Sequence, residues 1–205
     1  MAGANIRLPT VPTRRANYQI SYRVGQDRLV EGTAALDMQN RKSMTTAEIS
    51  AGFVSVFERL RKSMPPSSCT IEFGTTGSDA IAIVKPTNVK AAEIDARLKL
   101  DFGVYLTLGK GTVFELPLKG KRYTNLPFFE ELEAICKAVT LGKFEEGVSF
   151  VQDTVSSATG AVIIEGRKDM ITDSWVKIGW NLFRKKRTVH LTYESYTAAF
   201  EASKK

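Results

Sequence analysis

Histidine and cysteine are nearly absent from this chain. Its 205 residues include one histidine, His190, and two cysteines, Cys69 and Cys136, neither of which lies in a C-x-x-C motif. A structural zinc site takes about four His or Cys ligands, and an activated nucleophile needs a neighbouring base. His190 alternates with Val189 and Leu191, which is typical of a solvated or locally bonded strand residue. We therefore expect no metal site, no cofactor, no catalytic residue and no enzyme activity.

Long hydrophobic runs are lacking too. No stretch approaches the roughly 18 apolar residues that a membrane-spanning helix needs, and the first residues lack the apolar segment of a signal peptide. The two cysteines then indicate buried thiols in a reducing compartment, with a single disulfide as the alternative. We expect a cytoplasmic protein with no transmembrane segment.

The sequence also lacks the motifs of nucleotide-binding and acid–base sites. Neither G-x-x-x-x-G-K-[ST] nor G-x-G-x-x-G occurs. The paired acids Glu130-Glu131 and Glu145-Glu146 are chain neighbours, which do not converge on one substrate from a helix, so we expect a solvated helix face. The G-x-x-G stretch at 74–77 has the form of an RNA-binding loop, but it lies between two predicted strands and so predicts a hairpin turn.

Two amphipathic helices are the clearest elements. Thr45 and Glu48 form a capping-box pattern, and apolar residues then follow at helical spacing as far as Pro65-Pro66. In the second helix, Pro127 suits the first turn and Gly142 the stop. The predicted helices cover residues 45–64 and 125–141, with short helical stretches over 86–95 and 196–203.

Alternation of apolar and polar residues predicts the strands. The longest unbroken alternation runs from Ala96 to Leu108 and predicts one long strand with one buried face. The stretch from Glu145 to Gly160 is ambiguous, and its last five residues resemble a loop. The other predicted strands cover residues 18–24, 30–38, 69–73, 80–84, 112–116, 161–165, 175–183 and 188–193.

The order of these elements predicts the fold class. Strands and helices do not alternate regularly, as they would in a doubly wound sheet. We therefore predict an α+β fold with a mainly antiparallel sheet built from hairpins and two principal amphipathic helices. We expect a flexible basic N-terminal arm over residues 1–16, followed by a single globular domain over 17–205.

Positive charge is the remaining signal. The chain has 29 Lys and Arg against 22 Asp and Glu, which gives a net charge of +7 and a pI of about 9.4. The first 26 residues contain no acid. Of two further basic clusters, one follows a predicted hairpin and the other forms the tip of a predicted hairpin. The candidate nucleic-acid-binding residues are Arg7, Arg14 and Arg15 in the arm, Lys119, Lys121, Arg122 and Tyr123 after a hairpin, and Arg184, Lys185, Lys186 and Arg187 at a hairpin tip.

This charge favours a polyanionic partner. Cations at loop tips release counterions from a phosphate chain, and Tyr123 is placed to stack on an unpaired base. RNA or single-stranded DNA is favoured, because no helix has the base-reading pattern of a major-groove protein. Residues 124–155 carry a net charge of −4, and such polarity suits head-to-tail self-association. We hypothesise a non-enzymatic RNA- or single-stranded-DNA-binding protein that forms homo-oligomers in a packaging role, such as a nucleocapsid, coat or other virion component.

Other functions fit the same charges. As alternatives, the cations would hold a matrix-type assembly protein at an anionic membrane surface, or would recognise an acidic protein as a basic adaptor. An enzyme acting on a phosphorylated substrate through arginines and carboxylates is disfavoured by the single histidine. Charged turns also serve solubility, and the run at 184–187 matches an import signal, so a nuclear location is the alternative to the cytoplasm.

Overall fold

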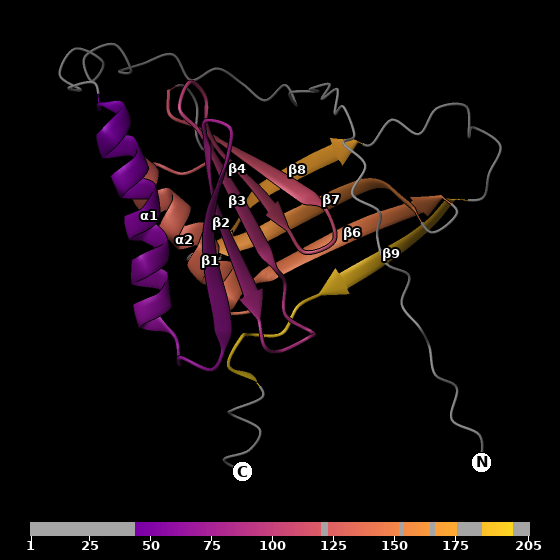
Figure 1. Cartoon of the computed structure of the whole chain (residues 1–205). Helices are drawn as coiled ribbons and strands as arrows, with labels where there is room; N and C mark the ends of the chain where they lie inside the picture. Colours follow the sequence, from indigo (N-terminus) through magenta and orange to yellow (C-terminus); the bar gives the residue numbers. More distant parts are fainter. Residues whose placement is uncertain (1–43, 120–122, 152–153, 165–166, 176–185, 199–205) are drawn as a thin grey trace.

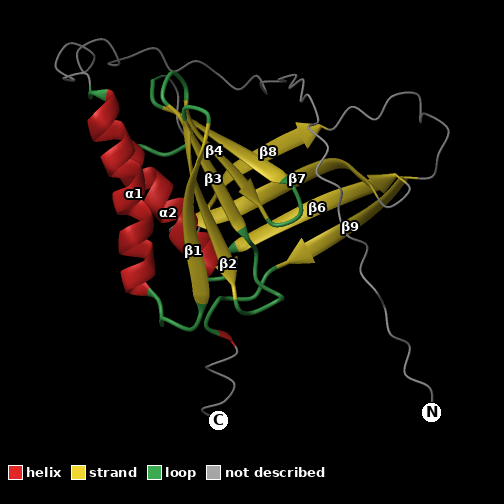
Figure 2. Cartoon of the chain, viewed as in Figure 1, coloured by secondary structure: helices red, strands yellow, loops and turns green. Residues whose placement is uncertain are grey.

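The computed structural model describes residues 44–119, 123–151, 154–164, 167–175 and 186–198. Within them it confirms the predicted α+β class, with two helices and two antiparallel sheets (Figure 1, Figure 2). The predicted arm at 1–16, the predicted strands at 18–24 and 30–38, and all but the first residue of the predicted strand at 175–183 lie outside the described residues.

Helix α1, Thr46–Ser63, begins and ends where the sequence predicts. The Thr45 side chain accepts a hydrogen bond from the Glu48 backbone N–H, and the Glu48 carboxylate accepts one from the Thr45 backbone N–H. This reciprocal pair satisfies donors that the first helical turn leaves unpaired. The buried face of α1 consists of Ile49, Phe53, Val56, Phe57 and Leu60.

Helix α2, Phe128–Thr140, corrects the expectation for one acidic residue. Pro127 is its N-cap, and Gly142 just after the helix has a φ of +72°, which favours glycine. Glu131, expected on a solvated face, is 0% exposed, and its Oε1 accepts a hydrogen bond of 2.6 Å from the Thr124 backbone N–H. The carboxylate therefore holds the segment that enters the helix.

The first sheet is a five-stranded meander in which each strand pairs antiparallel with the next along the chain. The first hairpin turns at Gly77-Ser78, so the predicted turn at 74–77 is largely strand. The strands of this sheet are β1 (Cys69–Thr76), β2 (Asp79–Pro86), β3 (Ile94–Lys99), β4 (Gly103–Leu108) and β5 (Thr112–Pro117).

The predicted long strand from Ala96 to Leu108 is wrong, because the chain reverses at residues 100–102. Strands β3 and β4 form a hairpin in which Leu98 pairs with Val104 and Ala96 with Leu106. Even-numbered residues therefore pair with even-numbered residues, and all four side chains lie on the same buried face. The alternation continues through the turn unchanged, so periodicity alone does not reveal it.

The predicted short helix over 86–95 is also wrong. Residues 87–93 form turns, and β3 already begins at Ile94. The Asn88 side chain donates a 3.0 Å hydrogen bond to the Ser195 carbonyl, and the Tyr196 hydroxyl donates one to the Ala92 carbonyl. This connection is therefore held by hydrogen bonds to a distant part of the chain, in place of hydrogen bonds within a helix.

The second sheet has the strand order β8-β7-β6-β9, all antiparallel. Its register places residues 156–160 within a long strand, so the loop predicted there is wrong. The predicted strand at 161–165 is the second half of the same element. The strands of this sheet are β6 (Phe144–Val151), β7 (Thr154–Ile164), β8 (Arg167–Trp175) and β9 (Lys186–Thr192).

One hydrophobic core joins these elements. It contains buried residues from both helices, from β2 to β5 and from the second sheet. Helix α2 packs against α1 and β7, and β5 meets β7 and β8 where the sheets come together (Figure 1). Cys136 lies in this core and Cys69 is half-buried, both as free thiols, as predicted. No helix among the described residues is long and apolar enough to cross a membrane.

Candidate functional site

Four of the eleven predicted binding residues lie within the described parts of the chain. Lys119 is exposed just after β5, Tyr123 is half-buried ahead of α2, and Lys186 and Arg187 begin β9. The structure does not bring these residues together into one described patch. The other predicted residues, which lie outside the described ranges, are Arg7, Arg14, Arg15, Lys121, Arg122, Arg184 and Lys185.

Tyr123 contributes to the core. Its ring packs edge-to-face against the buried Phe114, with ring centroids 6.3 Å apart and planes at 81°. Burial raises the pKa of the Tyr123 hydroxyl. The ring therefore has a packing role in the free protein, which the sequence interpretation did not anticipate.

The described half of the basic run at 184–187 belongs to a strand. Lys186 pairs with Val151 and Arg187 with Phe150, so these two residues are not at a hairpin tip as predicted. Arg187 is exposed. The basic run consequently leads directly into β9, the strand that carries His190.

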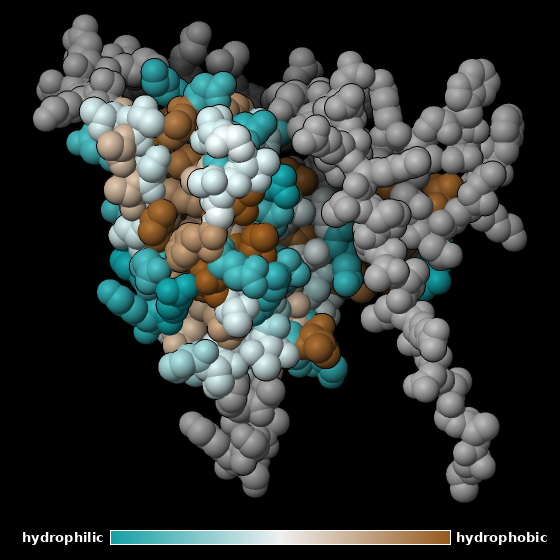
Figure 3. All heavy atoms as spheres, in the orientation of Figure 1, coloured by the Kyte–Doolittle hydropathy of each residue, from teal (hydrophilic) through white to brown (hydrophobic). Residues whose placement is uncertain are grey.

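The described part of the chain is almost neutral. It contains 15 of the 29 Lys and Arg residues and 16 of the 22 Asp and Glu residues. Many of its cations are already paired with acids at 2.7–3.2 Å. The cations in these ion pairs are Arg59, Arg61, Lys85, Lys90, Arg97 and Lys137. Figure 3 shows the helix side of the molecule, where small hydrophobic patches are separated by hydrophilic residues.

The outer face of the second sheet carries mainly small and polar residues, unlike its core-facing side. Neighbouring strands pair Gly147 with both Thr159 and His190, and Glu145 with both Ala161 and Thr192. Partners in a ladder project from the same face, so these small and polar residues form one surface. The next step along the ladder is also polar, because the hydroxyls of Ser149 and Thr188 lie 2.9 Å apart.

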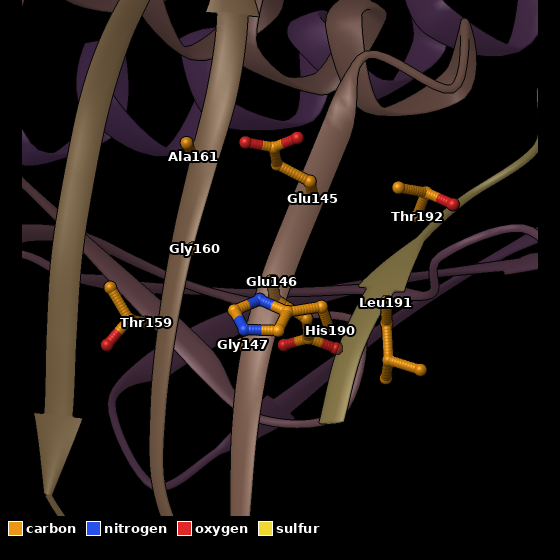
Figure 4. A pocket seen from close by; sticks show the side chains of 9 residues that line it. All are labelled: Glu145, Glu146, Gly147, Thr159, Gly160, Ala161, His190, Leu191 and Thr192. Atoms are coloured by element: carbon orange, nitrogen blue, oxygen red, sulfur yellow. The ribbon is translucent and has the colours of Figure 1, made fainter. Parts of the chain in front are cut away.

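A hollow of about 290 Å³ lies on this face. It crosses three adjacent strands, with β6 in the middle and β7 and β9 on either side (Figure 4). Its side chains are mainly polar or small, and no cluster of potential metal ligands occurs among the described residues. The residues lining it are Glu145, Glu146, Gly147, Thr159, Gly160, Ala161, His190, Leu191 and Thr192.

The imidazole of His190 lies beside Gly147 in this hollow. A Cβ atom at position 147 would lie 3.5 Å from both Cε1 and Nδ1 of His190. The ring therefore lies in van der Waals range of the space that a side chain on β6 would occupy, and Figure 4 shows it across the strand at this point. Because His190 is exposed, the imidazole remains accessible to a ligand.

A buried carboxylate lies on the opposite side of the same strand. Glu146, predicted on a solvated helix, is 2% exposed on β6, and its Oε1 accepts a 2.6 Å hydrogen bond from the Lys110 backbone N–H. Its Oε2 accepts a 2.8 Å hydrogen bond from the Thr112 hydroxyl, and the Tyr193 hydroxyl donates to Oε1. Burial and the hydrogen bond to Glu146 raise the pKa of Tyr193. These bonds join β6 to the turn between β4 and β5, so the group is structural.

Comparisons with known proteins add no assignment. No family model matches the chain, and no curated protein and no solved structure shows significant similarity to it.

The sequence does not reveal the hollow, because alternation marks only some of its strands. Residues 145–160 are ambiguous in sequence, so Gly147 and Thr159 cannot be placed opposite His190 without the strand pairing. One signal was present: an isolated glycine between alternating residues marks a bulge or a close approach within a strand. Gly147 is such a position.

Proposed function

We propose that the protein binds RNA or single-stranded DNA, without catalysis, through basic segments that lie mainly outside its nearly neutral described part. One observation carries this proposal. The residues outside the described ranges contain 14 of the 29 Lys and Arg residues but only 6 of the 22 Asp and Glu residues. The excess positive charge of the whole chain therefore belongs to those segments.

The ion pairs of the described residues support the same division. A cation already paired with a carboxylate gains less from a phosphate, because the existing partner must be displaced. The excess positive charge is concentrated in the first 42 residues and over 177–187, where 12 cations accompany 3 acids among these two segments. Such clusters favour contacts with phosphates, which supply most of the affinity for nucleic acids and make it dependent on salt.

Fluorescence anisotropy with labelled single-stranded RNA and DNA oligonucleotides over a salt series tests this proposal. We expect binding at low salt that weakens as salt increases. Changing Arg184, Lys185, Lys186 and Arg187 together to Ala should lower the slope of log K against log salt by up to about 3, since each phosphate contact contributes roughly 0.7 for a single strand. Absence of binding at low salt, or binding without a salt slope, would contradict the proposal.

A matched control separates local charge from total charge. Changing Lys85, Lys90, Arg97 and Lys137 together to Ala removes the same number of cations from positions that are ion-paired. We expect this variant to keep the slope of the unmodified protein. Equal losses in both variants would show that total charge alone governs binding.

Liposomes distinguish the membrane alternative. Cosedimentation with vesicles of anionic lipid, with and without competing oligonucleotide, should show weak binding that the oligonucleotide abolishes. Tight vesicle binding that survives competition would overturn the proposal in favour of a membrane-associated protein.

A further inference from the structure

The hollow on the outer face of the second sheet has the size of a site for one small ring system. Its volume of about 290 Å³ lies near the lower limit for small-molecule sites, which is about 300 Å³. Gly147 and Ala161 leave little side-chain bulk along its floor. A flat ligand can therefore approach the sheet closely between β7 and β9.

His190 supplies a surface for stacking. Its imidazole is exposed and lies across β6, within van der Waals distance of the position that a Cβ at Gly147 would take. Histidine is among the side chains on which proteins stack unpaired bases, and open sheet faces present such rings in RNA-binding proteins. The position of the ring is therefore suited to one face of a planar base.

Glu145 determines which groups the hollow accepts. Its carboxylate lines the same hollow, two residues along β6 from Gly147, or about 7 Å. A carboxylate repels phosphate but accepts N–H donors through both oxygens. Guanine presents a ring N–H and an exocyclic amino group on one edge, whereas the corresponding edges of adenine and uracil combine a donor with an acceptor.

The basic run connects this hollow to a phosphate chain. Lys186 lies four residues before His190 on β9, so the two backbone positions are about 13 Å apart. Arg187 is exposed one residue closer, but it alternates with Thr188 and His190 and so lies on the other face of the strand. A strand whose phosphates meet the basic run can place a base one or two nucleotides away over the imidazole.

We propose that the hollow over Gly147 holds one unpaired guanine of the bound strand, stacked on His190 and hydrogen-bonded through its N–H groups to Glu145. This inference rests on the proposed nucleic-acid binding and adds a base preference to it. The cations supply affinity that does not depend on sequence, and the hollow selects the base.

Two oligonucleotides test the preference directly. Anisotropy compares a labelled 12-mer of uridines with the same 12-mer carrying one central guanosine. We expect the guanosine-containing strand to bind about tenfold more tightly, within the range of a single stacked base. Equal affinity of the unmodified protein for both strands would overturn the inference and leave the proposed function intact, whereas no binding of either strand would remove both.

Substitutions test whether the preference for guanine arises in the hollow. His190→Ala and Gly147→Val should abolish it while retaining affinity for the uridine strand, and His190→Phe should preserve it because the ring remains. Gly74→Val is the matched control, since Gly74 is also a strand residue and a Cβ there meets nothing within 4 Å. A preference that survives both His190→Ala and Gly147→Val would overturn the inference.

The single histidine allows a readout without any substitution. In a chain with one histidine, the imidazole signals in an NMR spectrum belong to His190 alone. The guanosine-containing strand should shift these signals, and the uridine strand should shift them much less. Titration with free GMP, AMP and UMP forms a second arm of the experiment. If GMP binds as tightly as the guanosine-containing strand, the inference is overturned in favour of a site for a free nucleotide. Much weaker binding of GMP supports the inference.

Discussion

The Tyr193 hydroxyl donates a hydrogen bond to the buried Glu146 carboxylate and thereby ties the segment after β9 to the first half of β6. The ring of Tyr193 also stacks on Phe144, with centroids 5.3 Å apart and planes at 13°. A single side chain thus contributes both a polar and an apolar contact. These contacts can be separated by substitution.

Tyr193→Phe should destabilise the protein by about 1–3 kcal/mol, because it removes a donor from a buried carboxylate and keeps the stacked ring. Urea denaturation followed by circular dichroism measures the change. Tyr105→Phe is the control, since Tyr105 is half-buried and stacks on Phe102. Equal denaturation midpoints for Tyr193→Phe and the unmodified protein would show that the hydrogen bond contributes nothing.

Alkaline pH should destabilise the protein through Cys136. Burial raises the pKa of this thiol from 9.0 to about 12. The unfolded chain therefore loses this proton at lower pH than the folded protein does. The stabilising effect is complete below pH 9 and is lost as the pH rises toward 12, with a slope of about 1.4 kcal/mol per pH unit.

The cysteine contribution can be isolated by substitution. Cys136→Ala should make the free energy of unfolding less dependent on pH between 9 and 12, although it lowers the free energy itself by opening a cavity. The half-buried Tyr193 and the buried Tyr196 also have raised pKa values mainly through burial, so some dependence will remain. Identical pH profiles for Cys136→Ala and the unmodified protein would rule out the thiol as the cause.

Gly103→Ala should be strongly destabilising, by about 3 kcal/mol or more. Gly103 begins β4 with a φ of +146°, and a Cβ there would lie 2.0 Å from the Leu116 carbonyl oxygen. Backbone atoms cannot move aside as the end of a side chain can. Thermal unfolding should show a large loss for Gly103→Ala and little change for Gly74→Ala, and a small effect at both positions would contradict the close approach.

Removal of residues 1–16 tests the predicted arm. The deletion removes Arg7, Arg14 and Arg15, so the salt slope for oligonucleotide binding should fall by about 2. The melting temperature should stay the same, because the predicted fold begins at residue 17. A large loss of thermal stability would show instead that the segment belongs to the folded domain.

Local signals in the sequence predicted the two principal helices well. The Thr45–Glu48 capping box and the Pro127–Gly142 boundaries depend on neighbouring residues, which a sequence displays directly. The β3–β4 hairpin was hidden because pairing of even with even positions preserves alternation across a turn. Alternation therefore predicts the face of the sheet on which a residue lies. It does not predict the residue at which a strand ends.

The candidate site was less predictable than the fold. In the sequence, Glu131 and Glu146 look like any solvent-exposed acids. Their burial depends on hydrogen-bond donors that lie outside their own helix or strand. Gly147 and His190 are 43 positions apart and come together only when β9 pairs with β6. No short-range pattern predicts such a pair.

The pairing of β9 with β6 has a consequence for folding. Each strand of the first sheet pairs with its immediate neighbour in sequence, whereas Val151 and Lys186, the closest pair between β6 and β9, are 35 positions apart. Loops of that length close at a greater entropic cost than hairpins, so the meander can form before β9 docks. We therefore expect the hollow to assemble in a late step, and we expect reversible release of β9 to dismantle it while the first sheet stays folded.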